Sequence, residues 1–337
     1  GIIVARKGSL GNVFFEKDDF FPIDTVYYIT EKETELNLKF LFYYLLHMKL
    51  ENLRIVTSKP GISRDDVYSY RILDIPPLEQ DKIASILSNV DSLIESTEQV
   101  IENSKKVKVG LIQKLMKRGI GHTKFKKVPW LFDKKIEIPE EWELKQIKDI
   151  AEVSVGLVIN PSTYFDKNGT IPMITGKNII EKGIVLDEVD LITEKSNELL
   201  ETTRIWKNDL VTMRVGEPGR TGLVKNEHDG INCASVIITR KNKKYNSQFL
   251  LYLTKSELIK QQIIKYTAGG VQPVLNIGAW EKFLIIYPSL PEQQKIVSIL
   301  SNIDSKITSQ EQYKEKLLLL KKSLMQKLLT GEVRVKV

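Results

Sequence analysis

The segment Glu79–Asp91, EQDKIASILSNVD, returns almost unchanged as Glu292–Asp304, EQQKIVSILSNID. The match continues without a gap at the same offset of 213 residues, and about 21 of the 38 positions from Glu79 to Met116 are identical in the second copy. A continuous α-helix would preserve such a gap-free match, because one inserted residue rotates every later side chain by about 100°. The repeat therefore predicts two similar long helices.

Apolar residues recur in both copies at alternating steps of three and four residues, as in the seam of a coiled coil. Polar residues interrupt the seam in both copies, among them Lys108 and Lys321. A helix of about 40 residues is roughly 60 Å long, and neither copy can bury its apolar stripe alone. We therefore expect the two helices to pack side by side in antiparallel fashion. The residues predicted to form this contact are Ile83, Leu87, Val90, Ile94, Ile296, Leu300, Ile303 and Ile307.

The repeat extends upstream of the helices more faintly. Arg6 matches Arg214 at an offset of 208 residues, and Tyr43 matches Tyr252 at an offset of 209. The offset grows steadily toward 213, as small loop insertions between two diverging copies would produce. No part of the first copy corresponds to residues 138–205, and the chain begins with glycine. We therefore expect the first domain to lack its front half. The expected segments are a partial first domain at 1–78, a long helix at 79–118, a basic linker at 119–137, a second domain at 138–290, a second long helix at 291–330 and a tail at 331–337.

The two domains read as mixed α and β. β-branched content predicts strands in GIIVAR and DTVYYIT of the first copy and in LVTMRV and SVIITR of the second. The segments Leu38–Leu50 and Ser247–Ile264 are predicted as helices, and Gly- and Pro-containing stretches such as RKGSLGN, VGEPGRTG, SKPGIS and TAGGVQP as loops. The expected fold class is α+β, with two domains joined by the paired helices.

Composition and charge narrow the class of protein. Of the 337 residues, 42% are hydrophobic and 28% charged, as in ordinary globular proteins. The longest apolar run, Phe40–Met48, is far short of a membrane span. A single cysteine, Cys233, excludes an intrachain disulfide, so a reducing, cytoplasmic setting is expected. The formal charge of +7 favours a polyanionic partner, and residues 104–131 carry no acid beside nine Lys and Arg. A solvated helix face with a basic linker explains that run equally well.

The sequence contains no convincing catalytic motif. The sequence has neither a G-x-x-x-x-G-K-[ST] phosphate loop nor an H-E-x-x-H zinc pair. The three histidines, His47, His122 and His228, are far apart in the sequence, and one cysteine cannot supply a thiolate cluster. Gly119-Ile120-Gly121 follows a helix and is predicted to end it. No catalytic residue, metal site or bound cofactor is expected.

Several motifs together resemble the specificity subunit of type I restriction–modification systems. Each domain runs through a proline-containing exit into a Glu-Gln helix, IPPLEQDKIASIL and YPSLPEQQKIVSIL. The helices close with LIQKLM and LMQKLLTG, and the second domain opens with IPEEWELKQIKDIAEVSVG and continues to IPMITGKNI. The resemblance covers essentially the whole chain, apart from the front half of the first domain.

The resemblance implies a DNA-binding subunit without catalysis of its own. Two target-recognition domains would each read one half of a bipartite, asymmetric double-stranded DNA sequence, and the paired helices would set the gap between the halves. Methyltransferase subunits would bring S-adenosylmethionine, and a restriction and translocation subunit would join them, so that S-adenosylmethionine, Mg and ATP are expected on the partners alone. Three further hypotheses stay open: a subunit that reads one half-site or acts as a dimer, an enzyme with its own recognition domains, and a coiled-coil scaffold that binds no DNA.

Glycine-rich loops are the best candidates for DNA contact. Arg reads guanine, Asn and Gln read adenine, and Lys and backbone amides hold phosphate. Each candidate has a second interpretation as a surface charge or as a side chain that ties its own loop. The candidates are Lys177, Asn178, Arg214, Arg220, Thr221 and Gln272 in the second domain and Arg6, Lys7, Ser9, Asn12, Ser58, Lys59 and Arg64 in the first. Arg6 and Arg214 are common to both copies, which favours phosphate contact or a structural tie over base reading.

The repeated Glu-Gln pairs also allow two interpretations. Glu79-Gln80 and Glu292-Gln293 stand at the expected starts of the long helices, where an acid suits the positive end of the helix dipole. They are equally suited to contact a partner subunit.

Overall fold

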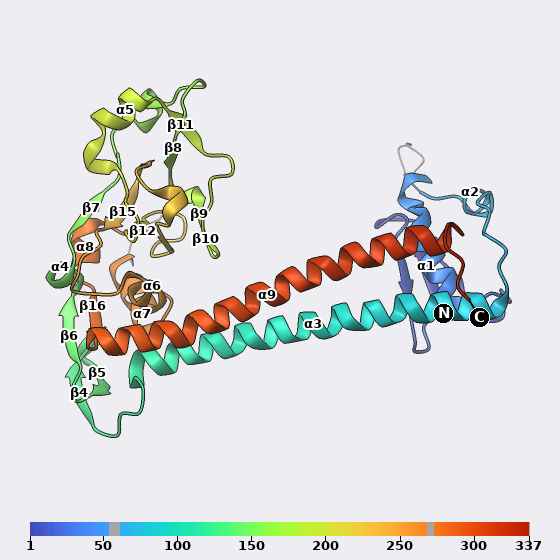
Figure 1. The fold of residues 1–337 in the computed structure, drawn as a ribbon, viewed down its shortest axis with the longest axis horizontal. Coiled ribbons are helices and arrows are strands. Elements are labelled where there is room, and N and C mark those ends of the chain that lie inside the picture. The colour runs from blue at the N-terminus through green and yellow to red at the C-terminus, as the bar shows by residue number, and fades with distance from the viewer. Residues whose placement is uncertain (54–60, 268–272, 337) are drawn as a thin grey trace. The chain divides into compact units, whose positions relative to one another are not determined.

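The computed structural model describes residues 1–53, 61–267 and 273–336. The chain divides into two compact units: unit 1 comprises residues 1–104 and 306–337, and unit 2 comprises residues 105–305. The division crosses both long helices, α3 (Pro77–Arg118) and α9 (Leu290–Leu329), so each unit contains one head domain and a part of each helix (Figure 1).

Within each unit α3 and α9 run antiparallel, as their ion pairs show. In unit 1 Lys321 pairs with Asp91 at 2.6 Å and Lys314 with Glu98 at 2.7 Å. In unit 2 Lys108 pairs with Asp304. The residue numbers of every pair add to 412, which is the signature of an antiparallel register. The predicted α+β fold with two long antiparallel helices is confirmed.

The head of unit 1, residues 1–76, is a small antiparallel sheet with one main helix. The strands β1 (Ile2–Ala5), β2 (Val13–Phe15) and β3 (Val26–Ile29) lie in the order β2-β1-β3. Apolar side chains of this sheet form one core with α1 (Leu38–Met48). The short helices η1 (Leu50–Leu53) and α2 (Arg64–Tyr68) complete the head.

The head of unit 2, residues 119–289, is larger and contains two principal apolar clusters. One surrounds Trp142 and Trp280, both fully buried, and includes residues of α3 and α9. The other lies around the central strands. The strands are β4 (Phe125–Pro129), β5 (Lys135–Pro139), β6 (Glu143–Gln146), β7 (Val153–Val155), β8 (Ile171–Ile174), β9 (Ile179–Ile180), β10 (Gly183–Ile184), β11 (Asp190–Ile192), β12 (Leu210–Met213), β13 (Thr221–Leu223), β14 (Asn232–Cys233), β15 (Val236–Thr239) and β16 (Leu284–Tyr287).

Helices of the second head are short. They are α4 (Ile147–Ile150), α5 (Glu194–Leu199), α6 (Ser247–Thr254), α7 (Glu257–Thr267) and α8 (Ile277–Glu281), with 3₁₀ turns η2 (Leu131–Asp133), η3 (Pro161–Tyr164), η4 (Gly176–Asn178), η5 (Glu201–Thr203) and η6 (Asn226–His228). The predicted helix Ser247–Ile264 is wrong in one respect, because it breaks between α6 and α7. The hydroxyl of buried Ser256 donates to the carbonyl of Leu253, and its own carbonyl accepts from the amide of Ile259, so the chain stops one helix and starts the next.

The sequence repeat is visible in the two sheets. The four-stranded sheet of unit 2 has the order β13-β12-β15-β7, and its first three strands correspond to β2, β1 and β3 of unit 1 at offsets close to 208. The described residues of unit 1 form no counterpart of β7, so β3 is an edge strand there. Residues 119–137, expected as a basic linker, instead contain β4 and the start of β5, which pair as an antiparallel hairpin. Across the described ranges, no helix combines the length and apolarity that a membrane crossing demands.

Candidate nucleic-acid interface and helix junctions

The candidate loop TGKNI of the second head contains one exposed cation and one buried amide. Lys177 is exposed and its ammonium lies 3.2 Å from a carboxylate oxygen of Asp190. Asn178 is buried; its carbonyl oxygen accepts from the amide of Thr175 at 3.0 Å, and its side-chain nitrogen lies 3.4 Å from the carbonyl oxygen of Asp187. The geometry therefore places Lys177 on the surface beside Asp190 and assigns Asn178 to holding the loop.

The loop RVGEPGRTG turns between β12 and β13. Arg214 is half-buried and its Nε donates to the carbonyl of Leu275 at 3.3 Å. Arg220 is half-buried beside Glu217, with which it forms an ion pair. Thr221 is buried, and its hydroxyl donates to the carbonyl of Gly219 at 3.0 Å. Arg220 and Thr221 therefore hold the turn itself, Arg214 ties the loop to Leu275, and both arginines keep part of their surface exposed.

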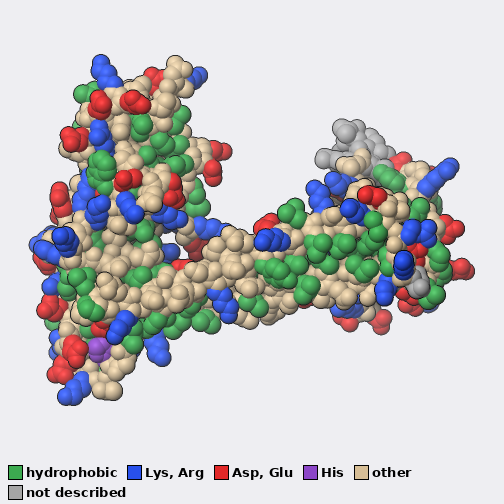
Figure 2. All heavy atoms as spheres, viewed as in Figure 1, with side chains coloured by type: hydrophobic (Ala, Val, Ile, Leu, Met, Phe, Trp, Pro, Cys, Tyr) green, Lys and Arg blue, Asp and Glu red, His purple; other side chains and the backbone are tan. Residues whose placement is uncertain are grey.

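The first head presents its candidates on loops around β1. Lys7, Ser9 and Asn12 are exposed, and Arg64 is exposed at the first turn of α2. Arg6 is half-buried, with its guanidinium 5.2 Å from the ring centre of Tyr27, a cation–π contact. The candidates Ser58, Lys59 and Gln272 lie outside the described residues. Lys and Arg side chains are spread over the visible face of both units and are interspersed with Asp and Glu, so no single basic stripe dominates that face (Figure 2).

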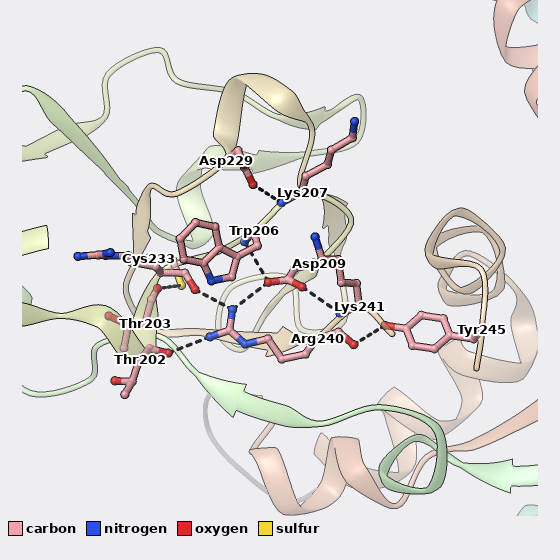
Figure 3. A network of polar contacts seen from close by, with 11 residues as sticks. Thr202, Thr203, Trp206, Lys207, Asp209, Asp229, Cys233, Arg240, Lys241 and Tyr245 are labelled. Atoms are coloured by element: carbon pink, nitrogen blue, oxygen red, sulfur yellow. Dashed lines mark hydrogen bonds and ion pairs between the residues drawn. The ribbon is translucent and has the colours of Figure 1, made fainter. Parts of the chain in front are cut away.

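A buried ion pair organises the loops behind β12 and β15 (Figure 3). Asp209, 1% exposed, accepts from the guanidinium of Arg240 at 2.8 Å and from the amides of Trp206 and Lys241. Arg240 also donates to the carbonyls of Arg204 and Thr202. The groups that donate to Asp209 all belong to the second head. The network therefore stabilises the scaffold that carries the loops of that head.

The Glu-Gln pair at the start of α9 joins that helix to the second head. The side chain of Gln293, fully buried, accepts from the amide of Asn246 at 2.9 Å and donates to the carbonyl of Pro288 at 2.9 Å. Glu292 accepts from the indole N–H of Trp142 at 2.8 Å, and its other oxygen lies 2.8 Å from Nε2 of His122. Both side chains thus face inward, to the head and to the turn after α3.

The pair at the start of α3 repeats this arrangement in unit 1. Gln80 accepts from the amide of Asn37 at 2.9 Å and donates to the carbonyl of Ile75 at 2.9 Å. The buried carboxylate of Glu79 accepts from Nη2 of Arg334 at 2.6 Å, from its Nε at 2.9 and 3.2 Å, and from the amide of Val335 at 3.0 Å. The hydrogen bonds from Arg334 are the chief reason that the pKa of Glu79 falls to about 2. The tail after α9 therefore contacts Glu79 in unit 1, as the turn after α3 contacts Glu292 in unit 2.

These contacts give the Glu-Gln pairs a role that neither interpretation of the sequence included. The side chains bind the heads and the segments that follow the partner helix, and they are not left facing outward. Their identity as junction residues was missed in the sequence, although their strict repetition was the signal. Of the residues predicted to form the helix seam, Ile94 and Ile303 are half-buried and the others are buried: Ile83, Leu87, Val90, Ile296, Leu300 and Ile307.

The two heads are related, and they attach in the same way to the antiparallel helices, but their loops differ. This arrangement defines a class of protein that presents two different surfaces on one repeated scaffold. The family described as "Type I restriction modification DNA specificity domain" matches residues 1–104 and 139–319. The chain belongs to this family. Its members are non-catalytic subunits, and the resemblance seen in the sequence is confirmed.

Individual relatives agree with this assignment. The MjaVIII type I restriction enzyme specificity subunit of Methanocaldococcus jannaschii is 29% identical over 99% of this chain and 79% of its own length. The EcoBI specificity subunit of Escherichia coli is 22% identical over 88% of this chain and 65% of its own length. The crystal structure of a type I S subunit from M. genitalium superposes with a TM-score of 0.56 over 97% of this chain and 82% of that chain, at 19% identity, which supports the shared fold.

Proposed function

We propose that the chain reads a bipartite, asymmetric sequence in double-stranded DNA and directs type I methyltransferase and restriction subunits to it. The observation that carries the proposal is the contrast between the two copies. The junction residues and much of the helices repeat, whereas the loops after β1 and β12 agree only at Arg6 with Arg214 and at two glycines and differ at the positions between them. Common frame and unlike loops are what two heads need if they attach alike and read different bases.

The exposed loop cations support a role on DNA without assigning base contacts. Lys7, Arg64 and Lys177 reach solvent from loops or from a helix start. Lysine and arginine in such positions neutralise phosphates and fix the register of a protein on the duplex. The bases recognised would then be read by neighbouring side chains of the same loops.

An apolar strip on the helix pair supports the docking of partner subunits. In unit 1 the side chains of Leu93 and Val100 on α3 and of Tyr313 and Leu320 on α9 are exposed. The antiparallel register places Leu93 near Leu320 and Val100 near Tyr313, since the numbers of each pair add to 413, so the four fall on adjacent helix faces. Figure 2 shows apolar side chains gathered over the helices of this unit. Contiguous exposed apolar surface of this kind marks protein–protein contact. Methyltransferase subunits carrying S-adenosylmethionine are the proposed occupants, while Mg and ATP would belong to a restriction subunit.

A methylation map tests the proposal. The chain is expressed with the methyltransferase subunit of its own locus in a host free of DNA methylation, and modified bases are located by sequencing. We expect one split motif with a fixed gap. The methyltransferase subunit expressed alone is the control and should give no such motif.

The remaining outcomes have distinct meanings. A single half-motif or a palindrome would mean that only the second head reads DNA, which would fit a first head whose described residues form no counterpart of β7. Absence of any motif, together with no DNA binding by the purified complex at low salt, would contradict the proposal and favour a scaffold.

A further inference from the structure

Each unit contains the same three-residue contact, built from one head and both long helices. In unit 1 the hydroxyl of Tyr43 on α1 donates to Asp91 on α3 at 2.7 Å, and Asp91 pairs with Lys321 on α9. In unit 2 the hydroxyl of Tyr252 donates to Asp304 on α9 at 2.7 Å. We call each set of tyrosine, aspartate and lysine a latch.

The second latch is completed by Lys108, which pairs with Asp304 from α3. The lysine therefore always comes from the long helix of the other copy. Its ammonium also lies near the ring of the latch tyrosine, 5.8 Å from the centre for Lys108 and 5.5 Å for Lys321. Such distances allow a cation–π contact, so all three members of a latch touch one another.

The latch chemistry favours one geometry. The aspartate accepts a charge-assisted bond from the ammonium and a short bond from the phenol, which are directional and stronger than neutral hydrogen bonds. Burial raises the pKa of Tyr43 and of Tyr252 well above the ordinary value for tyrosine, so each phenol keeps the proton that it donates. The lysines and aspartates are 19–36% exposed, so the contact is partly shielded from solvent.

Two points of attachment then hold each head helix. Gln80 binds the amide of Asn37 at the start of α1, and the latch binds Tyr43, six residues or about 9 Å further along the helix. In the second head Gln293 and the latch hold Asn246 and Tyr252 in the same way. One attachment would leave a pivot, whereas two fix the angle of the head helix against the long helices of its own unit.

We infer that the latches are positioning elements that set the angle of each head on the helix pair and thereby the gap that the chain accepts between two DNA half-sites. This inference rests on the proposed function. One base pair changes the separation of two half-sites by about 3.4 Å and rotates one about the DNA axis by roughly 35°. A head held at one angle rejects such a displacement, and a head free to pivot tolerates it.

The test uses the complex with its methyltransferase subunit and three DNA duplexes: the mapped motif, and the same motif with one base pair added to or removed from the gap. The ratio of the dissociation constants for altered and native gaps measures gap selectivity. We expect Tyr252→Phe and Asp304→Asn to lower this ratio about tenfold, the effect of losing one charge-assisted hydrogen bond. Lys108→Met, which leaves the tyrosine bond in place, should lower it by less, about threefold.

Tyr245→Phe is the matched control. Tyr245 is a buried tyrosine of the same head, but its hydroxyl donates to the carbonyl of Arg240, so this hydrogen bond stays within the head. It should leave the ratio unchanged, even if binding weakens equally on all three duplexes. Base preference within each half-site should stay the same in every variant.

The outcomes separate the inference from the proposed function. If Tyr252→Phe, Asp304→Asn and Lys108→Met all bind with the native gap selectivity, the latches do not set the gap and the inference is overturned. If the unaltered chain itself shows no split motif and no preference among the three duplexes, the proposed function fails first. Should Tyr252→Phe fail to fold, which its thermal melt would show, Asp304→Asn and Lys108→Met together decide the matter.

Discussion

At the residue scale, the junction side chains are single groups with partners far away in the sequence. Glu79 meets Arg334 at a separation of 255 residues, and Gln80 meets Asn37 across 43. The carboxylate of Glu79 joins the start of α3 to the tail. The side-chain amide of Gln80, which accepts from the backbone amide of Asn37, joins it to the head. These polar side chains therefore join elements, whereas the loop lysines Lys7 and Lys177 stay on the surface, where the proposed DNA contact would use them.

The Glu79–Arg334 pair predicts an acid-sensitive tail. Because the pKa of Glu79 is lowered to about 2 from an ordinary 4.5, its contribution to stability is full above about pH 4.5 and is lost as the pH falls from there toward 2. At pH 7 Glu79→Gln should therefore lower the thermal midpoint and expose residues 331–336 to carboxypeptidase. Thermal melts at pH 7, 4 and 3 should show the difference from the unaltered chain shrinking at each step.

The tail supplies a matched control for this experiment. Glu332 is an exposed carboxylate three residues from the carboxyl end of α9. Glu332→Gln removes the same charge without touching the α3 junction and should melt like the unaltered chain at every pH. A Glu79→Gln difference that stays constant from pH 7 to pH 3 would contradict the assignment.

At the element scale, the end of α3 depends on glycine. Gly119 has a φ of +63°, and a Cβ built there would lie 2.6 Å from both the Glu292 carboxylate and the Trp142 ring. Gly121 has a similar φ of +74° but no atom within 4 Å of such a Cβ. The two positions therefore separate backbone strain from steric conflict.

Alanine at these glycines should give unequal losses of stability. Gly121→Ala should cost about 1–2 kcal/mol, because alanine is strained in the left-handed region. Gly119→Ala should cost at least about 1 kcal/mol more, because it also displaces hydrogen-bond partners of Glu292. Urea unfolding of the two purified variants measures the difference, and equal losses would show that the Glu292 junction tolerates displacement.

The sequence predicted the elements better than their contacts. The gap-free repeat and its apolar spacing located both long helices, and Gly119 marked the end of α3, because these signals are local. The break at Ser256 and the β4–β5 hairpin were missed. A buried hydroxyl that ends a helix resembles any serine, and a lysine-rich strand on the surface lacks the apolar alternation that predicts strands. Lys108 and Lys321 were seen only as exceptions in the seam, since their aspartate partners lie on the other helix.

At the scale of the whole molecule, the two copies of the repeat agree at the residues that attach the heads and differ in most loop residues. Residues that hold each head to the helices, such as Tyr43 with Tyr252 and Asp91 with Asp304, are the same in both copies. The loops that follow β1 and β12 agree only at Arg6 with Arg214 and at two glycines, and their other residues differ. A head can therefore change what it reads without changing how it is held, provided that the junctions and latches are kept.

Salt dependence is the whole-molecule property that separates a DNA reader from a scaffold. The logarithm of the binding constant should fall linearly with the logarithm of salt concentration, with a slope of about −0.9 for each phosphate neutralised. Lys177→Gln should reduce the steepness of this slope by about 0.9 if Lys177 holds one phosphate, and should weaken binding to all DNA sequences alike.

Lys260→Gln is the matched control. Lys260 is 56% exposed and pairs with Glu257 at 3.0 Å, as Lys177 is 55% exposed and pairs with Asp190 at 3.2 Å. It lies on helix α7 rather than on a candidate loop and should leave the slope unchanged. Titrations of one duplex at several salt concentrations give all three slopes. Equal slopes for both variants and the unaltered chain would remove Lys177 from the interface, and a slope near zero for the unaltered chain would favour the scaffold.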